Sequence, residues 1–239
     1  MLSKSQIKLI TRLKQKKYRI ADGFFVAEGI KVIKELLESS LELHYLFTTE
    51  PFKSHTESET LITENELKKI SFLTTPNKAL AVFKIPEQKN IETQGLIVAL
   101  DSVRDPGNLG TIIRLCDWFG IKELICSKET VDCYNPKVVQ ATMGSITRVN
   151  ISYLDLNTFL AEAETPIFGA FMDGKNVYKS KLPKEGIIIM GNEANGISEE
   201  IEKQVTDRIA IPRFGDLQAT ESLNVATATA ILLSEFKRS

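Results

Sequence analysis

The chain has 239 residues, of which 43% are hydrophobic and 26% are charged, and its formal net charge is −1. This composition suits a globular protein, and the length fits one large domain or two smaller ones. No apolar run reaches the roughly 18 residues that a membrane-spanning helix needs, and the N-terminus lacks the apolar stretch of a signal peptide. The three cysteines have no metal-motif spacing, so we expect reduced thiols in a cytoplasmic protein.

The first 20 residues are strongly basic and contain no acidic residue. We expect a helix over about 3–17, in which Lys8, Arg12 and Lys16 recur every fourth residue and share one face. A basic stripe of this kind can follow a phosphate backbone. A solvated surface helix explains the same pattern, and on the stripe alone it is the favoured explanation.

Residues 1–85 are predicted to form a small α/β domain. Strand-like apolar runs at 24–28, 43–47 and 79–83 alternate with helical patterns. Thr63 and Glu66 have the spacing of a capping box, in which each side chain bonds the backbone amide of the other residue at the start of a helix. The polar segment 86–94, which begins with a proline, is the predicted linker to a second domain.

From residue 95 the chain alternates between strand-like and helical patterns. A continuous apolar run, typical of a strand buried on both faces, stands at 96–100, and further strand-like runs stand at 123–126, 167–171, 186–190 and 208–212. Apolar residues at helical spacing follow the first run, and a last helix is expected over 222–236. We therefore predict that residues 95–239 form an α/β domain whose sheet is mostly parallel, with helices on both faces.

Polar residues gather where these strands end, which is where open α/β sheets bind ligands. The three clusters are Asn108 with Arg114, then Gly191, Asn192 and Glu193, and finally Ser222 and Asn224. Each cluster alone also has a structural explanation. Arg114 could pair with Asp117, the glycine loop could be an ordinary turn, and Ser222 or Asn224 could cap the last helix.

Familiar catalytic signatures are absent from the second domain. It has neither a GxGxxG dinucleotide motif nor a P-loop lysine, and both histidines of the chain lie within the first 85 residues. A catalytic triad or a zinc site is therefore not expected, and we predict no metal.

Taken together, the three clusters resemble the three signature motifs of the SpoU/TrmH (SPOUT-class) family of RNA 2′-O-ribose methyltransferases. The first motif matches at Asn108, Gly110 and Arg114, and the second at Gly191, Glu193 and Gly196. The third matches at Ile211, Pro212, Gly215, Ser222, Leu223 and Asn224. The N-terminal region is similar to the substrate-binding domain of many members. One departure is an insertion-like stretch, DLQATE (216–221), before Ser222.

The resemblance implies a deep trefoil knot near the C-terminus, which binds S-adenosylmethionine, and a homodimer whose active site spans the interface. Knots are rare enough that no sequence pattern alone would indicate one. The matched positions make Gly191, Ile211 and Leu223 the expected cofactor-binding residues, with Ala170 as a further candidate. Basic residues at the N-terminus become the expected RNA-binding set, namely Lys8, Arg12, Lys16, Lys17 and Arg19.

The implied reaction is the attack of a ribose 2′-hydroxyl on the methyl group of the cofactor. Arg114 is the expected central residue, positioning ribose-phosphate and stabilising the developing oxyanion, because a guanidinium stays protonated and is a poor base. Asn108, Glu193, Ser222 and Asn224 would position Arg114 and the substrate. Ribosomal RNA is the favoured substrate. The alternatives are a tRNA 2′-O-methyltransferase and a non-catalytic RNA-binding or ribosome-assembly factor.

Overall fold

The computed structural model describes residues 1–52, 59–215 and 222–238. The chain divides into two compact units. The first unit comprises Met1–Gln88 and Asp132–Thr147, and the second comprises Lys89–Val131 and Arg148–Ser239. The change from the first unit to the second at Gln88 falls inside the segment 86–94 that the sequence marks as a linker.

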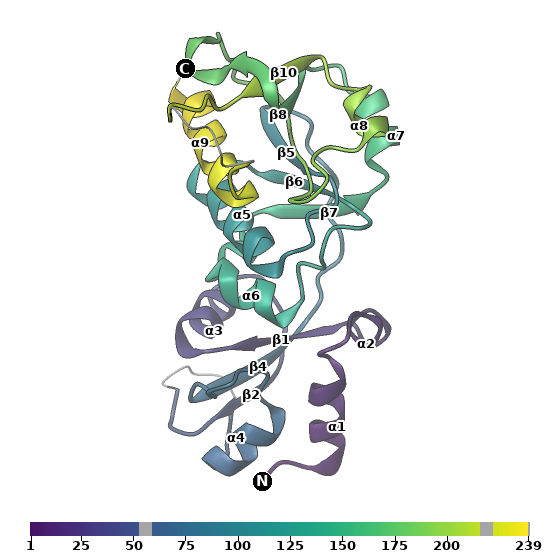
Figure 1. Ribbon diagram of the computed structural model, residues 1–239. Helices are drawn as coiled ribbons and strands as arrows, with labels where there is room; N and C mark the ends of the chain where they lie inside the picture. Colours follow the sequence, from purple (N-terminus) through teal and green to yellow (C-terminus); the bar gives the residue numbers. More distant parts are fainter. Residues whose placement is uncertain (53–58, 216–221, 239) are drawn as a thin grey trace. The chain divides into compact units, whose positions relative to one another are not determined.

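The first unit contains a four-stranded sheet in the order β1-β4-β2-β3 (Figure 1). Strand β4 pairs antiparallel with β1 and β2, and β2 pairs parallel with β3. Its strands are β1 (Phe24–Glu28), β2 (Leu43–Thr48), β3 (Glu59–Leu61) and β4 (Ala79–Lys84). Its helices are α1 (Lys4–Arg12), α2 (Lys16–Asp22), α3 (Ile30–Leu37), α4 (Glu64–Ile70) and α6 (Pro136–Thr142), with a 3₁₀ turn η1 (Ser145–Thr147). The capping box predicted at Thr63 and Glu66 is present at the start of α4.

The prediction that Lys8, Arg12 and Lys16 share one face of a continuous helix is wrong. Helix α1 ends at Arg12 and α2 begins at Lys16. The guanidinium of Arg19 explains the break, because its Nη1 donates to the carbonyl oxygens of Leu13 and Lys14 at 2.8 and 2.9 Å. Those two carbonyls would otherwise accept the helical hydrogen bonds that carry α1 onward.

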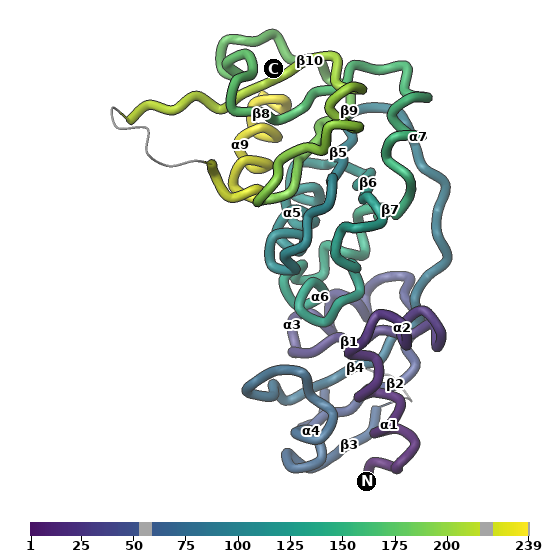
Figure 2. Tube along the Cα trace, turned by 45° about the vertical axis from the view of Figure 1, so that its right-hand side comes forward, coloured from purple at the N-terminus to yellow at the C-terminus, as the bar shows by residue number. Residues whose placement is uncertain are grey.

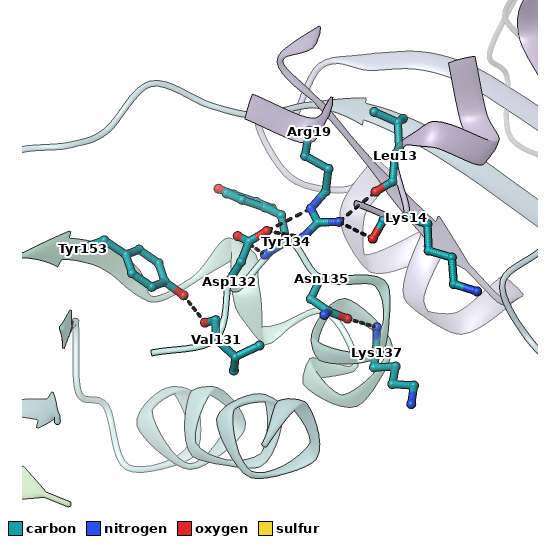
Figure 3. A network of polar contacts seen from close by, with 9 residues as sticks. All are labelled: Leu13, Lys14, Arg19, Val131, Asp132, Tyr134, Asn135, Lys137 and Tyr153. Atoms are coloured by element: carbon teal, nitrogen blue, oxygen red, sulfur yellow. Dashed lines mark hydrogen bonds and ion pairs between the residues drawn. The ribbon is translucent and has the colours of Figure 1, made fainter. Parts of the chain in front are cut away.

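Arg19 is buried, with 2% of its surface exposed, so its predicted contact with RNA is also wrong. Figure 3 shows its guanidinium between the two carbonyls and the carboxylate of Asp132. Nε and Nη2 of Arg19 donate to one oxygen of Asp132 at 2.9 and 2.5 Å. Buried charges are tolerated where hydrogen bonds satisfy them in this way, so Arg19 is a structural residue.

Residues 132–147 were expected in the second domain but pack within the first unit. The ring of Tyr134 lies 4.8 Å from that of Phe25 on β1, and α6 contacts the same strand. Gly144, with φ +98°, brings its backbone so close to α3 that a Cβ there would lie 2.5 Å from Cβ of Glu35. Together with the Arg19–Asp132 pair, these contacts fix the segment against the N-terminal sheet.

The second unit is built on a six-stranded sheet in the order β10-β8-β9-β5-β6-β7. All five pairings are parallel, in agreement with the mostly parallel sheet predicted from the alternating strand-like and helical patterns. The strands are β5 (Leu96–Leu100), β6 (Glu123–Ser127), β7 (Asn150–Leu154), β8 (Ile167–Asn176), β9 (Gly186–Met190) and β10 (Asp207–Ala210). Between them lie α5 (Pro106–Trp118), α7 (Leu156–Ala161), η2 (Val177–Lys179) and α8 (Glu199–Glu202), and α9 (Val225–Arg238) follows β10.

Helices cover both faces of this sheet, as predicted. On one face, Leu156 of α7 and Ile201 of α8 share a buried cluster with Ile97 and Ile187 of the central strands. Ile167 of β8 belongs to the same cluster. Because successive strand residues point to opposite faces, Phe168 points to the other face of the sheet. There its ring centroid lies 5.1 Å from that of Phe236 on α9. Helix α9 lies beside α5 on this second face (Figures 1 and 2).

Substituting Arg19→Ala should lower the free energy of unfolding by about 3 kcal/mol or more, the range seen when one partner of a buried ion pair is removed. The matched control is Lys84→Ala, which removes an ion pair to Glu42 whose side chains are 58% and 72% exposed. Such exposed pairs contribute less than about 1 kcal/mol. Urea denaturation of both variants measures the difference, and equal losses would contradict a structural role for Arg19.

Candidate active site

A cavity of about 1000 Å³ opens at the carboxyl-terminal ends of β9 and β10. Parallel pairing brings strand ends to one edge of the sheet, where open α/β folds bind ligands. All four expected cofactor-binding residues line this cavity, namely Ala170, Gly191, Ile211 and Leu223. Glu193 and Ser222 of the predicted catalytic set line it as well. The inserted residues 216–221 lie outside the described part of the chain.

Gly191 is required by the fold of its own loop. A Cβ at this position would lie 2.2 Å from the carbonyl carbon of Gly196 and 2.4 Å from the backbone nitrogen of Ile197. The loop is this tight because Asn192 and Gly196 exchange two backbone hydrogen bonds of 2.9 Å each. The close contact at Gly191 is therefore made with its own chain, and both Gly191 and Gly196 line the cavity.

One hydrogen-bonded chain joins residues from all three sequence motifs. Nδ2 of Asn224 donates to Oδ1 of Asn108 at 2.9 Å, and Nδ2 of Asn108 donates to Oε1 of Glu193 at 2.8 Å. Oδ1 of Asn224 accepts from the backbone amides of Ala226 and Thr227, so the residue also caps α9. Because these amides donate to the Asn224 oxygen, the NH₂ group of Asn224 must face Asn108. Asn224 therefore donates to Asn108, and Asn108 donates in turn to Glu193.

A second set of contacts ties the end of β5 to the loop that carries Glu193. Oδ2 of Asp101 accepts from the backbone amide of Ser198 at 2.7 Å, and the carbonyl of Ser102 accepts from Nδ2 of Asn192 at 2.6 Å. Ser102 has φ +59°, which is uncommon for a residue with a side chain. Its amide donates to Oγ of Ser127 at 3.0 Å, which anchors this conformation.

Sequence reasoning missed Asp101 and Ser102 and mentioned Asn192 without a role. Asp101 directly follows the buried strand β5, just as Gly191 follows β9. The same signal, a polar residue at the end of a buried parallel strand, could have identified it.

Arg114 is exposed on α5 and is not among the residues that line the cavity. Its possible pairing with Asp117 is not formed, because Oδ2 of Asp117 accepts from Nε of Arg148 at 2.9 Å. Within residues 1–52, 59–215 and 222–238, no hydrogen bond or ion pair of Arg114 is formed. The structure thus unites Asn108, Glu193 and Asn224 and leaves the guanidinium facing solvent.

Two further observations concern the described residues. No group of three His, Cys, Asp or Glu side chains is placed to hold a metal ion in this part of the chain. No helix among the same residues is long and apolar enough to cross a membrane.

Comparison with known proteins gives matches over both units. The model of the SpoU rRNA Methylase family matches residues 95–234, and that of the MRM3-like substrate binding domain matches residues 4–81. The 23S rRNA (guanosine(2553)-2′-O)-methyltransferase RlmP of Bacillus subtilis is 27% identical over 231 residues, covering 93% of this chain and 92% of that protein.

Solved structures agree along the whole length. A putative RNA methyltransferase of the TrmH family from Porphyromonas gingivalis has 39% identity and a TM-score of 0.90, covering 100% of this chain and 99% of the other. An AdoMet-bound rRNA methyltransferase from Sinorhizobium meliloti has 29% identity and a TM-score of 0.87, covering 100% and 97%. With the three motifs gathered at one sheet edge, these matches show that the chain belongs to the SpoU rRNA methylase family.

Proposed function

We propose that this protein transfers the methyl group of S-adenosylmethionine to a ribose 2′-hydroxyl in RNA, with ribosomal RNA as the substrate and the cytoplasm as the place of action. The observation that carries the proposal is the hydrogen-bonded chain Asn224–Asn108–Glu193, which unites three distant motifs beside the cavity. The Bacillus subtilis relative is named for this reaction on 23S rRNA. The three cysteines are buried and form no disulfide within the described part of the chain, as suits a reducing compartment.

The cavity fits the cofactor in size and chemistry. Its volume of about 1000 Å³ lies at the upper end of the range of roughly 300–1,000 Å³ for small-molecule pockets. Its wall combines apolar side chains such as Ile211 and Leu223 with the backbone around Gly191, which can bind an adenine ring and polar groups respectively. We propose Gly191, Ile211, Leu223 and Ala170 as the cofactor-binding residues.

The bound cofactor would supply a methyl group on a positively charged sulfur. Transfer would break the bond between the methyl carbon and sulfur, form a carbon–oxygen bond to the ribose, leave the sulfur as a neutral thioether and release the hydroxyl proton to water. The protein must position the hydroxyl and help it to lose a proton. Glu193 lines the cavity and is held by Asn108, which sets its orientation toward the substrate. Ser222 lines the same cavity and could hydrogen-bond the ribose.

We assign to Arg114 the stabilisation of the developing negative charge on the 2′-oxygen. Its guanidinium is exposed and lies six residues beyond Asn108 on α5, so it belongs to the same helix as the hydrogen-bonded chain. Arg114 does not line the cavity of its own protomer, so it can reach the reacting atoms only if another surface holds them beside α5. A second copy of the chain would provide that surface.

Arg114→Ala should lower the rate of methyl transfer by a factor on the order of 100 or more, as expected when a charge-stabilising donor is lost. Cofactor affinity, measured by calorimetry, should remain within about twofold because Arg114 does not line the cavity. Lys122→Ala, which removes a cation whose side chain is 82% exposed in the same unit, is the control. A full rate for the Arg114 variant would exclude Arg114 from the chemistry.

Mapping of 2′-O-methyl sites in total RNA, with and without the gene, identifies the target nucleotide.

We propose that the protein forms a homodimer through the exposed face of α5. Trp118 lies one helical turn beyond Arg114 on that face, and 84% of its surface is exposed. A tryptophan this exposed leaves a large apolar surface in water, which dimerisation would cover.

Light scattering should give twice the chain mass of 26.7 kDa for the natural protein and a monomer for Trp118→Glu. Trp118 is the only tryptophan in the sequence, so its fluorescence should shift to longer wavelength when the dimer is diluted. Leu61→Glu, at a residue that is 56% exposed in the first unit, is the control and should leave the mass unchanged. A monomeric natural protein at all concentrations would contradict this interface.

We propose that the C-terminal segment follows the trefoil-knotted path implied by the family. Support comes from the sheet order, in which β10 lies at the edge while α9 returns to pack beside α5. Continuous density through residues 211–225 in a crystal structure would test the path, and an unthreaded chain there would refute it.

We propose that the first unit binds RNA through Lys8, Lys16 and Lys17, which are exposed. Arg12 contributes less because its Nη2 bonds Asp22 at 2.6 Å. Changing the three lysines to Gln should reduce the slope of log affinity against log salt by about 2, close to 0.7–0.9 for each phosphate contact. Lys31, Lys68 and Lys69, also exposed in this unit, form a matched triple control. An unchanged slope would exclude the N-terminal lysines.

A further inference from the structure

Exposed apolar side chains gather around the mouth of the cavity. Met172, Phe214 and Leu223 line it and are 53%, 82% and 48% exposed. Tyr178, which is 39% exposed, faces Phe214 with a distance of 6.3 Å between ring centroids. Apolar surface left in water at one place usually marks a binding site.

The two rings are presented by neighbouring strands. Strands β8 and β10 pair in parallel, with Asn176 opposite Ala210 at their ends. Tyr178 follows Asn176 by two residues and Phe214 follows Ala210 by four, so both rings leave the sheet at the same edge. Figure 2 shows the two strands side by side.

The Tyr178 turn is held in place before any ligand arrives. Oδ1 of Asn176 accepts from the backbone amide of Tyr178 at 2.9 Å, and Oγ of Ser180 donates to the Asn176 carbonyl at 2.9 Å. A ring on such a braced turn loses little conformational freedom when it binds a flat ligand.

The spacing of the rings suits a flat ring inserted between them. The Phe25–Tyr134 pair in the first unit has centroids only 4.8 Å apart, whereas Tyr178 and Phe214 are 6.3 Å apart with 32° between their planes. Insertion of an aromatic ring needs about 7 Å, twice the ~3.5 Å carbon contact distance. The two centroids, 6.3 Å apart, would therefore have to separate by at least about 0.7 Å.

We propose that Tyr178 and Phe214 form a stacking site for a nucleobase of the RNA substrate, at or next to the methylated nucleotide. This inference rests on the proposed function, which requires a nucleotide at the mouth of the same cavity. Stacking on aromatic side chains is how proteins bind unpaired bases, because every base has a flat π face. The site binds an unpaired base, so the target nucleotide lies in a loop, a bulge or another single-stranded element.

The test compares Phe214→Leu and Tyr178→Leu with the aromatic replacements Phe214→Trp and Tyr178→Phe, using ribosomal RNA from cells that lack the gene. Each Leu variant should raise KM for RNA by about 5-fold to 100-fold, the range for loss of one stacked base. The turnover number at saturating RNA should stay within twofold. For Tyr178→Leu, whose side chain is not among those that line the cavity, the cofactor dissociation constant without RNA should also stay within twofold. Both aromatic variants should restore KM.

Three results would overturn the stacking site. An unchanged KM would remove the rings from RNA binding, and an equal loss of cofactor affinity would assign them to the cofactor. A change of molar mass in light scattering would assign Phe214 to a contact between protomers. If the natural protein itself methylates no RNA, the proposed function fails and the stacking site falls with it, whereas a wild-type KM for RNA in the Leu variants of an active protein refutes the stacking site alone.

Discussion

The parallel pairing of β5 with β9 is the constraint on which the site depends. It places Leu100 opposite Met190, so the two strands end side by side and the residues that follow them, Asp101 and Gly191, begin together. From there Asp101 and Ser102 hold the loop that contains Glu193, and Asn108 at the start of α5 reaches the same carboxylate. A shift of this register by one residue would point each strand residue at the opposite face and separate these groups.

Much of the second unit could be predicted because its signals are local. A run such as 186–190 is apolar at every position, which is typical of a strand covered on both faces in an α/β fold. The meeting of Asn108, Glu193 and Asn224 was anticipated only through their joint resemblance to three family motifs. Each residue alone allowed an equally good explanation, and Asn224 in fact satisfies both, since it caps a helix and bonds Asn108.

The failures arise where a distant side chain decides the local structure. No helical propensity near Leu13 marks the end of α1, because the break comes from Arg19, which is itself held by a carboxylate 113 residues along the chain. The placement of residues 132–147 has the same origin. The surroundings of Arg114 could not be predicted for a different reason. Helical spacing places the residue on α5, but the spacing does not indicate which surface covers the exposed face of that helix.

Because residues 132–147 pack within the first unit, the two units cannot be separated by a single cut of the chain. The backbone passes between them three times, at 88–89, at 131–132 and at 147–148, so one cut in the segment 86–94 would not yield two complete units. A chain shortened to residues 95–239 would keep α6 without the sheet that it covers. The N-terminal piece would in turn lose the carboxylate that neutralises Arg19. The order of residues along the chain and the division into compact units therefore differ in this protein. A transplanted N-terminal unit would have to bring residues 132–147 with it.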